Sequence, residues 1–313
     1  SDPNDKKVKF NNGHFLHQFT YFIGPVNFYY MEGKEKKVAE MNTGDSMYIS
    51  PYIPHSFTTR KNPEKKLGHI LALTYTDKVD SESLNELAAI GYDLAKKLKL
   101  NLDNEFEAFK SILNYQMQVS SITKDILLEK GNINLDKILE RNTVPDIEEL
   151  KKISKILKIN VRDLLPPVKE HAVKIQKYKE NLKWYYPSNK NKNYIFVELA
   201  NLSQLPSSKA YEVSIVSEKE NDINFEIPSH QYVYNIGESK CVLKIEDKIC
   251  ENFEPGDSVY LKPNLKHKYI NKSKLLILRI GGKISGDSLF QLSMLSEKNI
   301  ERTIQDNLPW FNS

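Results

Sequence analysis

The sequence predicts a mixed fold, in which two related strand-rich blocks stand on either side of an α-helical block. The first observation is an internal repeat: HQFTYFIG at 17–24 recurs as HQYVYNIG at 230–237, and GDSMYISPYIPH at 44–55 recurs as GDSVYLKPNLKH at 256–267. The second is the alternation of aromatic and β-branched residues with polar ones around both copies. The third is a stretch of helical periodicity between them. Because an internal repeat indicates a repeated architecture, the two strand-rich blocks are expected to be copies of one unit.

The first strand-rich block covers residues 8–76, within an expected domain of residues 1–80. Turns are expected at Gly24, Gly33 and Gly44, because glycine permits the backbone conformations that tight turns require.

The second strand-rich block begins at Trp184 and runs to about Arg279, within an expected domain of residues 169–313. A linker helix is expected over 169–183, ahead of the strands, and a tail of mixed structure follows them.

The intervening domain, residues 81–168, has apolar residues three and four positions apart, which is typical of amphipathic helices. Helices are expected over 83–97, 105–118, 122–130, 135–141 and 147–157. Pro166 and Pro167 end the block, because proline cannot continue a helix. This block resembles the helix-turn-helix domain of phage-repressor-type regulators, and the resemblance lies in LLEKG at 127–131, in 135–141 and in ISKILKINVRDLL at 153–165.

The helix-turn-helix resemblance raises the question of DNA binding, and the charge pattern argues against it. The expected reading helix, 134–142, carries Lys137 and Arg141 but also Asp136 and Glu140. That balance provides little of the phosphate attraction on which DNA affinity depends. A structural role is therefore favoured, and no nucleic-acid partner is expected.

The composition of the 313 residues is that of an ordinary globular chain, with 40% hydrophobic and 27% charged residues. The net charge of +4 is too small to indicate a polyanionic partner by itself. No apolar run approaches the ~18 residues of a membrane span, and the first residues lack the apolar core of a secretory signal. Cys241 and Cys250 are the only cysteines, which favours a reducing, cytoplasmic compartment without a disulfide framework.

One difference between the two copies decides which of them can hold a metal. The first copy has His14 four residues before Gln18, and His55 ends its second motif. The second copy has Ile227 at the place of His14, and an aliphatic side chain cannot bind a metal. The metal ligands and catalytic residues are therefore expected to be His14, Gln18 and His55, with one metal in the first copy and none in the second.

The pattern Gly-Asp, five residues, Pro, three residues, His, preceded by a histidine-containing strand, resembles the two motifs of the cupin β-barrel. The resemblance implies that inward-facing side chains of each strand-rich block converge inside a small barrel. It covers nearly all of both blocks, and so implies two cupin barrels separated by a helix-turn-helix domain. The second barrel would be a degenerate copy retained for structure.

The ligand set narrows the resemblance to the phosphonate-processing cupin oxygenases, which carry a helix-turn-helix domain beside each barrel. The family's epoxidase has a glutamate at the position of Gln18. The family's dioxygenase of hydroxyethylphosphonate takes its carboxylate from six residues before the last histidine, where this chain has Ile49. A glutamine with this isoleucine resembles the branch that makes methylphosphonate. By the same resemblance, Asn11 binds the phosphonate.

This resemblance implies a cytoplasmic dioxygenase that uses Fe(II) and O₂ to cleave 2-hydroxyethylphosphonate to methylphosphonate and CO₂, as bicarbonate. Fe(II) is the expected cofactor, a small phosphonate and O₂ are the expected partners, no membrane is involved, and a homo-oligomer is expected. Because a carboxamide is neutral, the iron would keep one more positive charge than with a carboxylate, which favours an anionic, chelating substrate. Two other interpretations stay open: a dioxygenase that gives hydroxymethylphosphonate and formate, and a transcriptional regulator.

The sequence departs from the family pattern where the substrate would bind. The family's helix-turn-helix lysine aligns near Ser120, and the upstream Arg and Tyr that hold the phosphonate would lie before residue 1. Sixteen residues precede His17, whereas roughly forty residues of strand material precede His230. The sequence given is therefore expected to begin inside a domain of a longer protein.

Overall fold

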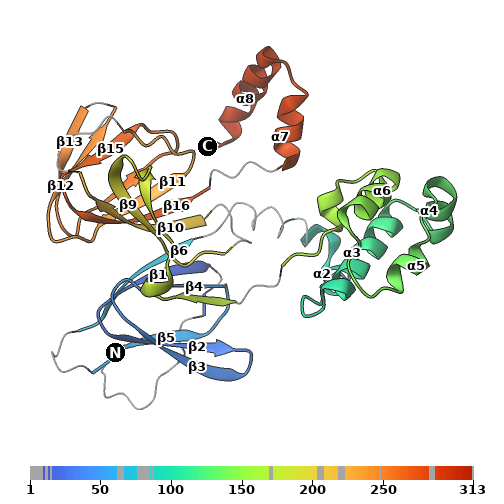
Figure 1. The fold of residues 1–313 in the computed structure, drawn as a ribbon, viewed down its shortest axis with the longest axis horizontal. Coiled ribbons are helices and arrows are strands. Elements are labelled where there is room, and N and C mark those ends of the chain that lie inside the picture. The colour runs from blue at the N-terminus through green and yellow to red at the C-terminus, as the bar shows by residue number, and fades with distance from the viewer. Residues whose placement is uncertain are drawn as a thin grey trace. The chain divides into compact units, whose positions relative to one another are not determined.

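The chain folds as two compact units, a strand-rich unit of residues 1–77 with 173–313 and a helical unit of residues 78–172. Both copies of the repeat lie in the strand-rich unit (Figure 1). The expected mixed fold of antiparallel sheets and helices is confirmed. The computed structural model describes residues 10, 13–14, 16–61, 67–75, 85, 88–168, 172–202, 208–217, 223–246, 248–281 and 286–311.

The first copy of the repeat forms two antiparallel sheets. In spatial order, one consists of β6 (His69–Tyr75), β1 (His17–Ile23), β4 (Ser46–Ile49) and β7 (Val173–Gln176). The other consists of β3 (Glu35–Met41), β2 (Val26–Glu32) and β5 (His55–Thr59). Because β1 lies between β4 and β6, Gln18 has Ile49 opposite it on one side and Thr74 on the other.

The second copy repeats this arrangement. One sheet consists of β14 (Ser258–Leu261), β11 (His230–Asn235), β16 (Lys274–Ile280), β10 (Ser208–Ile215), β9 (Lys192–Glu198) and β8 (Lys183–Pro187). The other consists of β13 (Lys248–Phe253), β12 (Cys241–Ile245) and β15 (His267–Ile270). Gln231 pairs with Leu261 and Arg279 as Gln18 pairs with Ile49 and Thr74, so the two copies share one register.

Strand β1 is buried on both faces, and each face has a different neighbour. Phe22 joins the core of the first copy, with Val26, Phe28, Met41, Met47 and Ile49. Phe19 and Tyr21 join a second cluster that includes residues of the second copy, among them Leu199, Ala210, Leu276 and Leu278. Since successive residues of a strand point to opposite faces, Gln18 and Thr20 share the face of Phe22 and point into the first copy.

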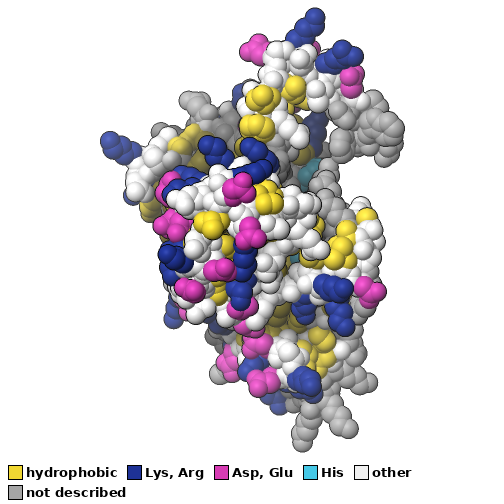
Figure 2. Space-filling model, turned by 90° about the vertical axis from the view of Figure 1, so that its right-hand side faces the viewer, with side chains coloured by type: hydrophobic (Ala, Val, Ile, Leu, Met, Phe, Trp, Pro, Cys, Tyr) yellow, Lys and Arg dark blue, Asp and Glu magenta, His cyan; other side chains and the backbone are white. Residues whose placement is uncertain are grey.

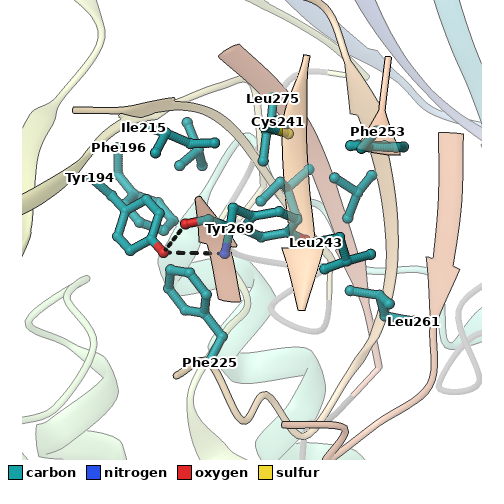
Figure 3. Close-up of a cluster of buried hydrophobic side chains, with 13 residues drawn as sticks. Tyr194, Phe196, Ile215, Phe225, Cys241, Leu243, Phe253, Leu261, Tyr269 and Leu275 are labelled. Atoms are coloured by element: carbon teal, nitrogen blue, oxygen red, sulfur yellow. Dashed lines mark hydrogen bonds between the residues drawn. The ribbon is translucent and has the colours of Figure 1, made fainter. Parts of the chain in front are cut away.

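The second copy has its own core, in which aromatic rings pack with aliphatic side chains from both sheets (Figure 3). The Tyr194 hydroxyl donates a hydrogen bond of 2.9 Å to the Tyr269 carbonyl and accepts one of 3.3 Å from the Tyr269 N–H. Cys241 is a free thiol in this core, and burial raises its pKa to about 12, so the thiol stays protonated at neutral pH.

The helical unit has short helices around one core. They are α2 (Tyr92–Lys97), α3 (Glu105–Val119), α4 (Lys124–Gly131), α5 (Leu135–Leu139), α6 (Ile147–Leu157) and the 3-10 helix η1 (Val161–Leu164). Four of the α-helices have an N-cap residue whose side-chain oxygen accepts a hydrogen bond from a backbone N–H of the first turn. These residues are Asn104, Thr123, Asn134 and Asp146. Phe109, Leu127 and Ile153 lie at the centre of the core.

The linker helix expected over 169–183 is wrong. In the described part of that stretch the chain forms β7, the 3-10 turn η2 (Tyr178–Glu180) and the start of β8. Val173 and Ile175 alternate with polar residues and pack on the core of the first copy, where β7 pairs with β4. Contacts with a distant strand therefore decide the structure here, and helical propensity does not.

Two other segments refine the expectations. The helix expected over 83–97 is described in part, and Gly91, with a φ of 82°, precedes α2. The tail of mixed structure contains the helices α7 (Gly286–Ser293) and α8 (Glu297–Phe311). Within the described ranges, every helix is too short or too polar to span a membrane.

Candidate metal centre

His14, Gln18 and His55 come from different segments and meet at one point. Gln18 is buried in β1, and His55 is the buried first residue of β5. His14 precedes β1, and its carbonyl accepts a hydrogen bond of 2.8 Å from the N–H of Tyr52, in the turn before β5. That turn therefore holds the backbone of His14 close to the start of β5. Asn11, the expected phosphonate ligand, lies outside the described residues.

A single oxygen atom contacts both histidines. Gln18 Oε1 lies 2.7 Å from His14 Nε2 and 3.3 Å from His55 Nε2. The two imidazole rings are nearly perpendicular, with centroids 5.3 Å apart and 82° between their planes. Imidazole nitrogens and a carbonyl-type oxygen are ligands for first-row divalent cations, and here three of them converge.

The protons of the two rings are directed away from this point. His14 Nδ1 lies 2.7 Å from the Leu16 carbonyl, and His55 Nδ1 lies 2.9 Å from the Ile53 carbonyl. Because a carbonyl can only accept, each neutral ring carries its proton on Nδ1 and donates it there. Each Nε2 then presents a lone pair to Gln18 Oε1. A cation bound by the three atoms would stabilise such an arrangement, and a metal-binding histidine commonly donates its other ring N–H to a carbonyl in this way.

Protonation of His55 is disfavoured as an alternative source of positive charge. Burial lowers the pKa of His55, and the nearby His14 lowers it further, against the opposing effect of the hydrogen bond to the Ile53 carbonyl. The rings of Phe57 and Phe28 lie around the imidazole, with centroid distances of 5.7 and 6.5 Å. This apolar surrounding strengthens electrostatic interactions at the centre.

The orientation of the Gln18 carboxamide is fixed by its nitrogen. Gln18 Nε2 donates a hydrogen bond of 2.9 Å to Thr20 Oγ1, and both side chains are buried. That bond directs Oε1 to the histidines. In the described part of the chain, no group of three His, Cys, Asp or Glu side chains gathers at metal-binding distance. The cluster at Gln18 has a carboxamide as its third donor.

The second copy is arranged differently at each of these points. Gln231 Nε2 lies 3.4 Å from His267 Nε2, and Gln231 Oε1 accepts a hydrogen bond of 3.1 Å from Arg279 Nε. The guanidinium lies over the rings of Phe196 and Tyr211, 5.8 and 5.2 Å from their centroids. Burial lowers the pKa of His267 to about 4, and the Arg279 charge acts in the same direction. In the second copy the carboxamide oxygen therefore binds a cation of the protein, and the carboxamide nitrogen faces the histidine.

Sequence reasoning brought His14, Gln18 and His55 together but missed two residues that shape the two clusters. Thr20 lies within the first motif but is not repeated, since the second copy has Val233 there. Arg279 lies outside both motifs, and the first copy has Thr74 in its place. A comparison of the two copies position by position would have identified Thr20 as a residue that differs beside the shared glutamine. Arg279 could be identified only from the strand register, which places it opposite Gln231.

Among known proteins, a relative matches this amino-acid sequence along the whole chain. No family model matches the chain. Methylphosphonate synthase from Nitrosopumilus maritimus (strain SCM1) is 41% identical over 320 residues, a match that covers 100% of this chain and 69% of that protein.

Two solved structures have a similar fold over nearly the whole of this chain. Streptomyces albus 2-hydroxyethylphosphonate dioxygenase, with its substrate and Fe(II) bound, is 31% identical, with a TM-score of 0.83 over 97% of this chain and 70% of that chain. A variant of 2-hydroxyethylphosphonate dioxygenase, 17% identical, has a TM-score of 0.77 over 96% of this chain and 73% of that one, and it shares the fold.

Fold and sequence together define an iron-dependent oxygenase of the phosphonate-processing class. Within that class, the identity over the whole chain shows that it belongs to the methylphosphonate synthase family.

Proposed function

We propose that this chain uses Fe(II) and O₂ to cleave the C–C bond of 2-hydroxyethylphosphonate, giving methylphosphonate and CO₂ as bicarbonate. The convergence of His14 Nε2, His55 Nε2 and Gln18 Oε1, with both Nδ1 protons directed to backbone carbonyls, carries the proposal. The relative named methylphosphonate synthase and the Streptomyces albus structure with 2-hydroxyethylphosphonate and Fe(II) support the same substrate and metal. Methylphosphonate, CO₂ and water together balance the atoms of the substrate and O₂.

The donor set fits Fe(II). Two neutral imidazoles and a neutral carboxamide would hold it through His14, His55 and Gln18, and their backbone and Thr20 partners fix each donor atom. Bound iron supplies the redox chemistry with O₂ and the Lewis acidity that a phosphonate oxygen and a hydroxyl require. Because none of the three ligands is charged, the centre keeps its full positive charge, which favours an anionic substrate over a neutral one.

The chain's own residues perform the remaining tasks. The Leu16 and Ile53 carbonyls keep the ring protons away from the metal-binding side, so each histidine is ready to bind without losing a proton. Phe28 and Phe57 give the His55 side of the centre an apolar wall. Asn11 is proposed, by resemblance alone, to bind the phosphonate.

The finer architecture is part of the proposal. Each copy's pair of antiparallel sheets is proposed to be a cupin barrel, and the helical unit a helix-turn-helix domain. The domain bounds 1–80, 81–168 and 169–313 stay predictions, as do the homo-oligomer and the cytoplasmic location. The pairing of β7 with β4 means that residues after 168 contribute to the sheet of the first copy.

Product analysis tests the function directly. The full chain would be reconstituted with one Fe(II) without oxygen, then given O₂ and 2-hydroxyethylphosphonate, and the products followed by ³¹P NMR. Methylphosphonate as the main product is expected. Hydroxymethylphosphonate with formate would instead favour the dioxygenase interpretation. The Streptomyces albus dioxygenase has a similar fold. An unconsumed substrate would contradict both.

A further inference from the structure

A carboxamide is an asymmetric metal ligand. Its oxygen can bind a divalent cation and its NH₂ group cannot, yet the two ends have nearly the same shape. Which end faces a metal therefore depends on the partner of the other end. In the first copy that partner is Thr20, whose hydroxyl oxygen accepts a hydrogen bond of 2.9 Å from Gln18 Nε2. Thr20 is fully buried and lies two residues after Gln18 on the same face of β1.

The second copy is a natural comparison for this contact. Gln231 occupies the position of Gln18 and also lies beside a buried histidine, His267. Val233 stands where the first copy has Thr20, so no hydroxyl is present two residues on. The carboxamide there has the opposite orientation, with its nitrogen towards His267 and its oxygen towards Arg279. The orientation changes with the partners, although the glutamine is the same.

We propose that Thr20 is a positioning residue: its hydroxyl holds the Gln18 carboxamide with the oxygen towards His14 and His55, and thereby makes a glutamine usable as a metal ligand. The inference rests on the metal centre proposed above. A glutamate at this position would need no such partner, because both ends of a carboxylate are oxygen.

Loss of the hydroxyl has a definite physical consequence. Without Thr20 Oγ1, the buried Gln18 NH₂ group loses its acceptor, and a buried donor without a partner is costly. Rotation of the carboxamide restores two acceptors, since the Nε2 lone pairs of His14 and His55 then receive the NH₂ group. That rotated state stabilises the metal-free protein and competes with metal binding.

The test measures metal affinity in the full chain. Thr20→Val keeps the shape of the side chain and removes the hydroxyl, and Thr20→Ser restores it. Affinities for Fe(II), and for Co(II) as an oxygen-stable probe, would be measured without oxygen by competition with a chromophoric chelator. Thr20→Val is expected to lose about 10-fold to 100-fold in affinity, the range typical of residues that orient a ligand, and Thr20→Ser to recover most of it. The matched control is Thr58→Val in β5, a buried threonine whose hydroxyl lies 3.5 Å from that of Tyr29.

A second background separates positioning from packing. In a chain that carries Gln18→Glu, Thr20→Val is expected to reduce metal affinity several-fold less than it does in the Gln18 chain. The reason is that either oxygen of a carboxylate can bind the metal. Equal losses in both backgrounds would overturn the inference in favour of a packing role, and so would a wild-type affinity in Thr20→Val. A wild-type chain that binds neither metal ion would overturn the proposed metal centre itself, and the inference with it.

Discussion

Gln18 and Ile49 lie directly opposite each other in the pairing of β1 with β4, and both side chains are buried. Cross-strand partners share a face of the sheet, so a carboxylate at position 49 would point to the same place as the Gln18 carboxamide. The chain has a hydrocarbon side chain there, which leaves β1 as the strand that provides the oxygen donor. The second copy has the same kind of pair in Gln231 and Leu261.

Removal of either proposed histidine ligand is expected to remove most of the activity. His14→Ala or His55→Ala should lower turnover by at least about 100-fold, because two donors hold a catalytic metal poorly. The circular dichroism spectrum should be retained. His267→Ala is the matched control, since His267 is equally buried and its Nδ1 also faces a backbone carbonyl, that of Leu265, at 2.7 Å. Comparable loss in that control would mean that the histidines act through the fold.

Gln18→Glu is expected to keep or increase iron affinity while changing the outcome of the reaction. A charged oxygen ligand binds a divalent cation better than a neutral one, and it lowers the net charge of the centre. Turnover should fall, or product should shift towards hydroxymethylphosphonate. A ³¹P product ratio under single-turnover conditions checks this, with Gln231→Glu as the control. An unchanged rate and ratio would put Gln18 outside the metal's ligands.

The second copy is expected to bind no metal even after its missing histidine is restored. One metal per chain should be found in the wild type and in Ile227→His, because the Arg279 guanidinium, whose Nε lies 3.1 Å from Gln231 Oε1, would repel a divalent cation there. Ile227→His with Arg279→Thr removes that charge and should give a second site. Metal analysis after dialysis provides the count. Two tightly bound metals in the wild type would contradict the assignment of a single centre.

His267 is expected to make the strand-rich unit sensitive to acid. Its pKa of about 4 in the folded chain lies below the ordinary value of 6.5, so the unfolded chain takes up a proton first as the pH falls. Stability is therefore unaffected above about pH 6.5 and decreases between there and pH 4, by about 2 kcal/mol at pH 5. Urea unfolding of metal-free protein at pH 8 and pH 5 measures the difference. In His267→Gln, the free energy of unfolding should decrease less between pH 8 and pH 5. A decrease equal to that of the wild type would contradict the role given to His267.

The helical unit is expected to show no sequence-selective DNA affinity. Two of its cations have acidic partners: Lys124 binds Asp136 at 2.5 Å, and Arg141 binds both carboxylate oxygens of Glu149 at 2.7 and 2.8 Å. Figure 2 shows basic and acidic side chains interspersed over the face that it presents, with no continuous basic stripe. A salt-dependent, sequence-selective gel shift at submicromolar protein would restore the regulator interpretation.

Much of the candidate centre follows from the repeat, because paired motifs reveal both the shared strands and the one position that differs. His14, Gln18 and His55 meet as their spacing predicts. The role of Thr20 depends on which end of the Gln18 carboxamide it contacts, and that of Arg279 on which strands are neighbours, so neither could be predicted in the same way. The same limit explains the error over 169–183. Alternating Val173 and Ile175 form a strand because β4 offers an unpaired edge, and no local pattern contains that information.

The place of β7 in the sheet has a consequence for the order in which the protein is made. The strand that covers the β4 edge is translated after the whole helical unit, although β4 itself precedes that unit. While the ribosome is still adding the helices, the sheet that carries Gln18 has an open edge, the kind of surface that invites pairing with other nascent chains. The helical unit, which is made in this interval, has a hydrophobic core of its own. Completion of the sheet that carries Gln18, a proposed metal ligand, must wait until Val173–Gln176 has emerged.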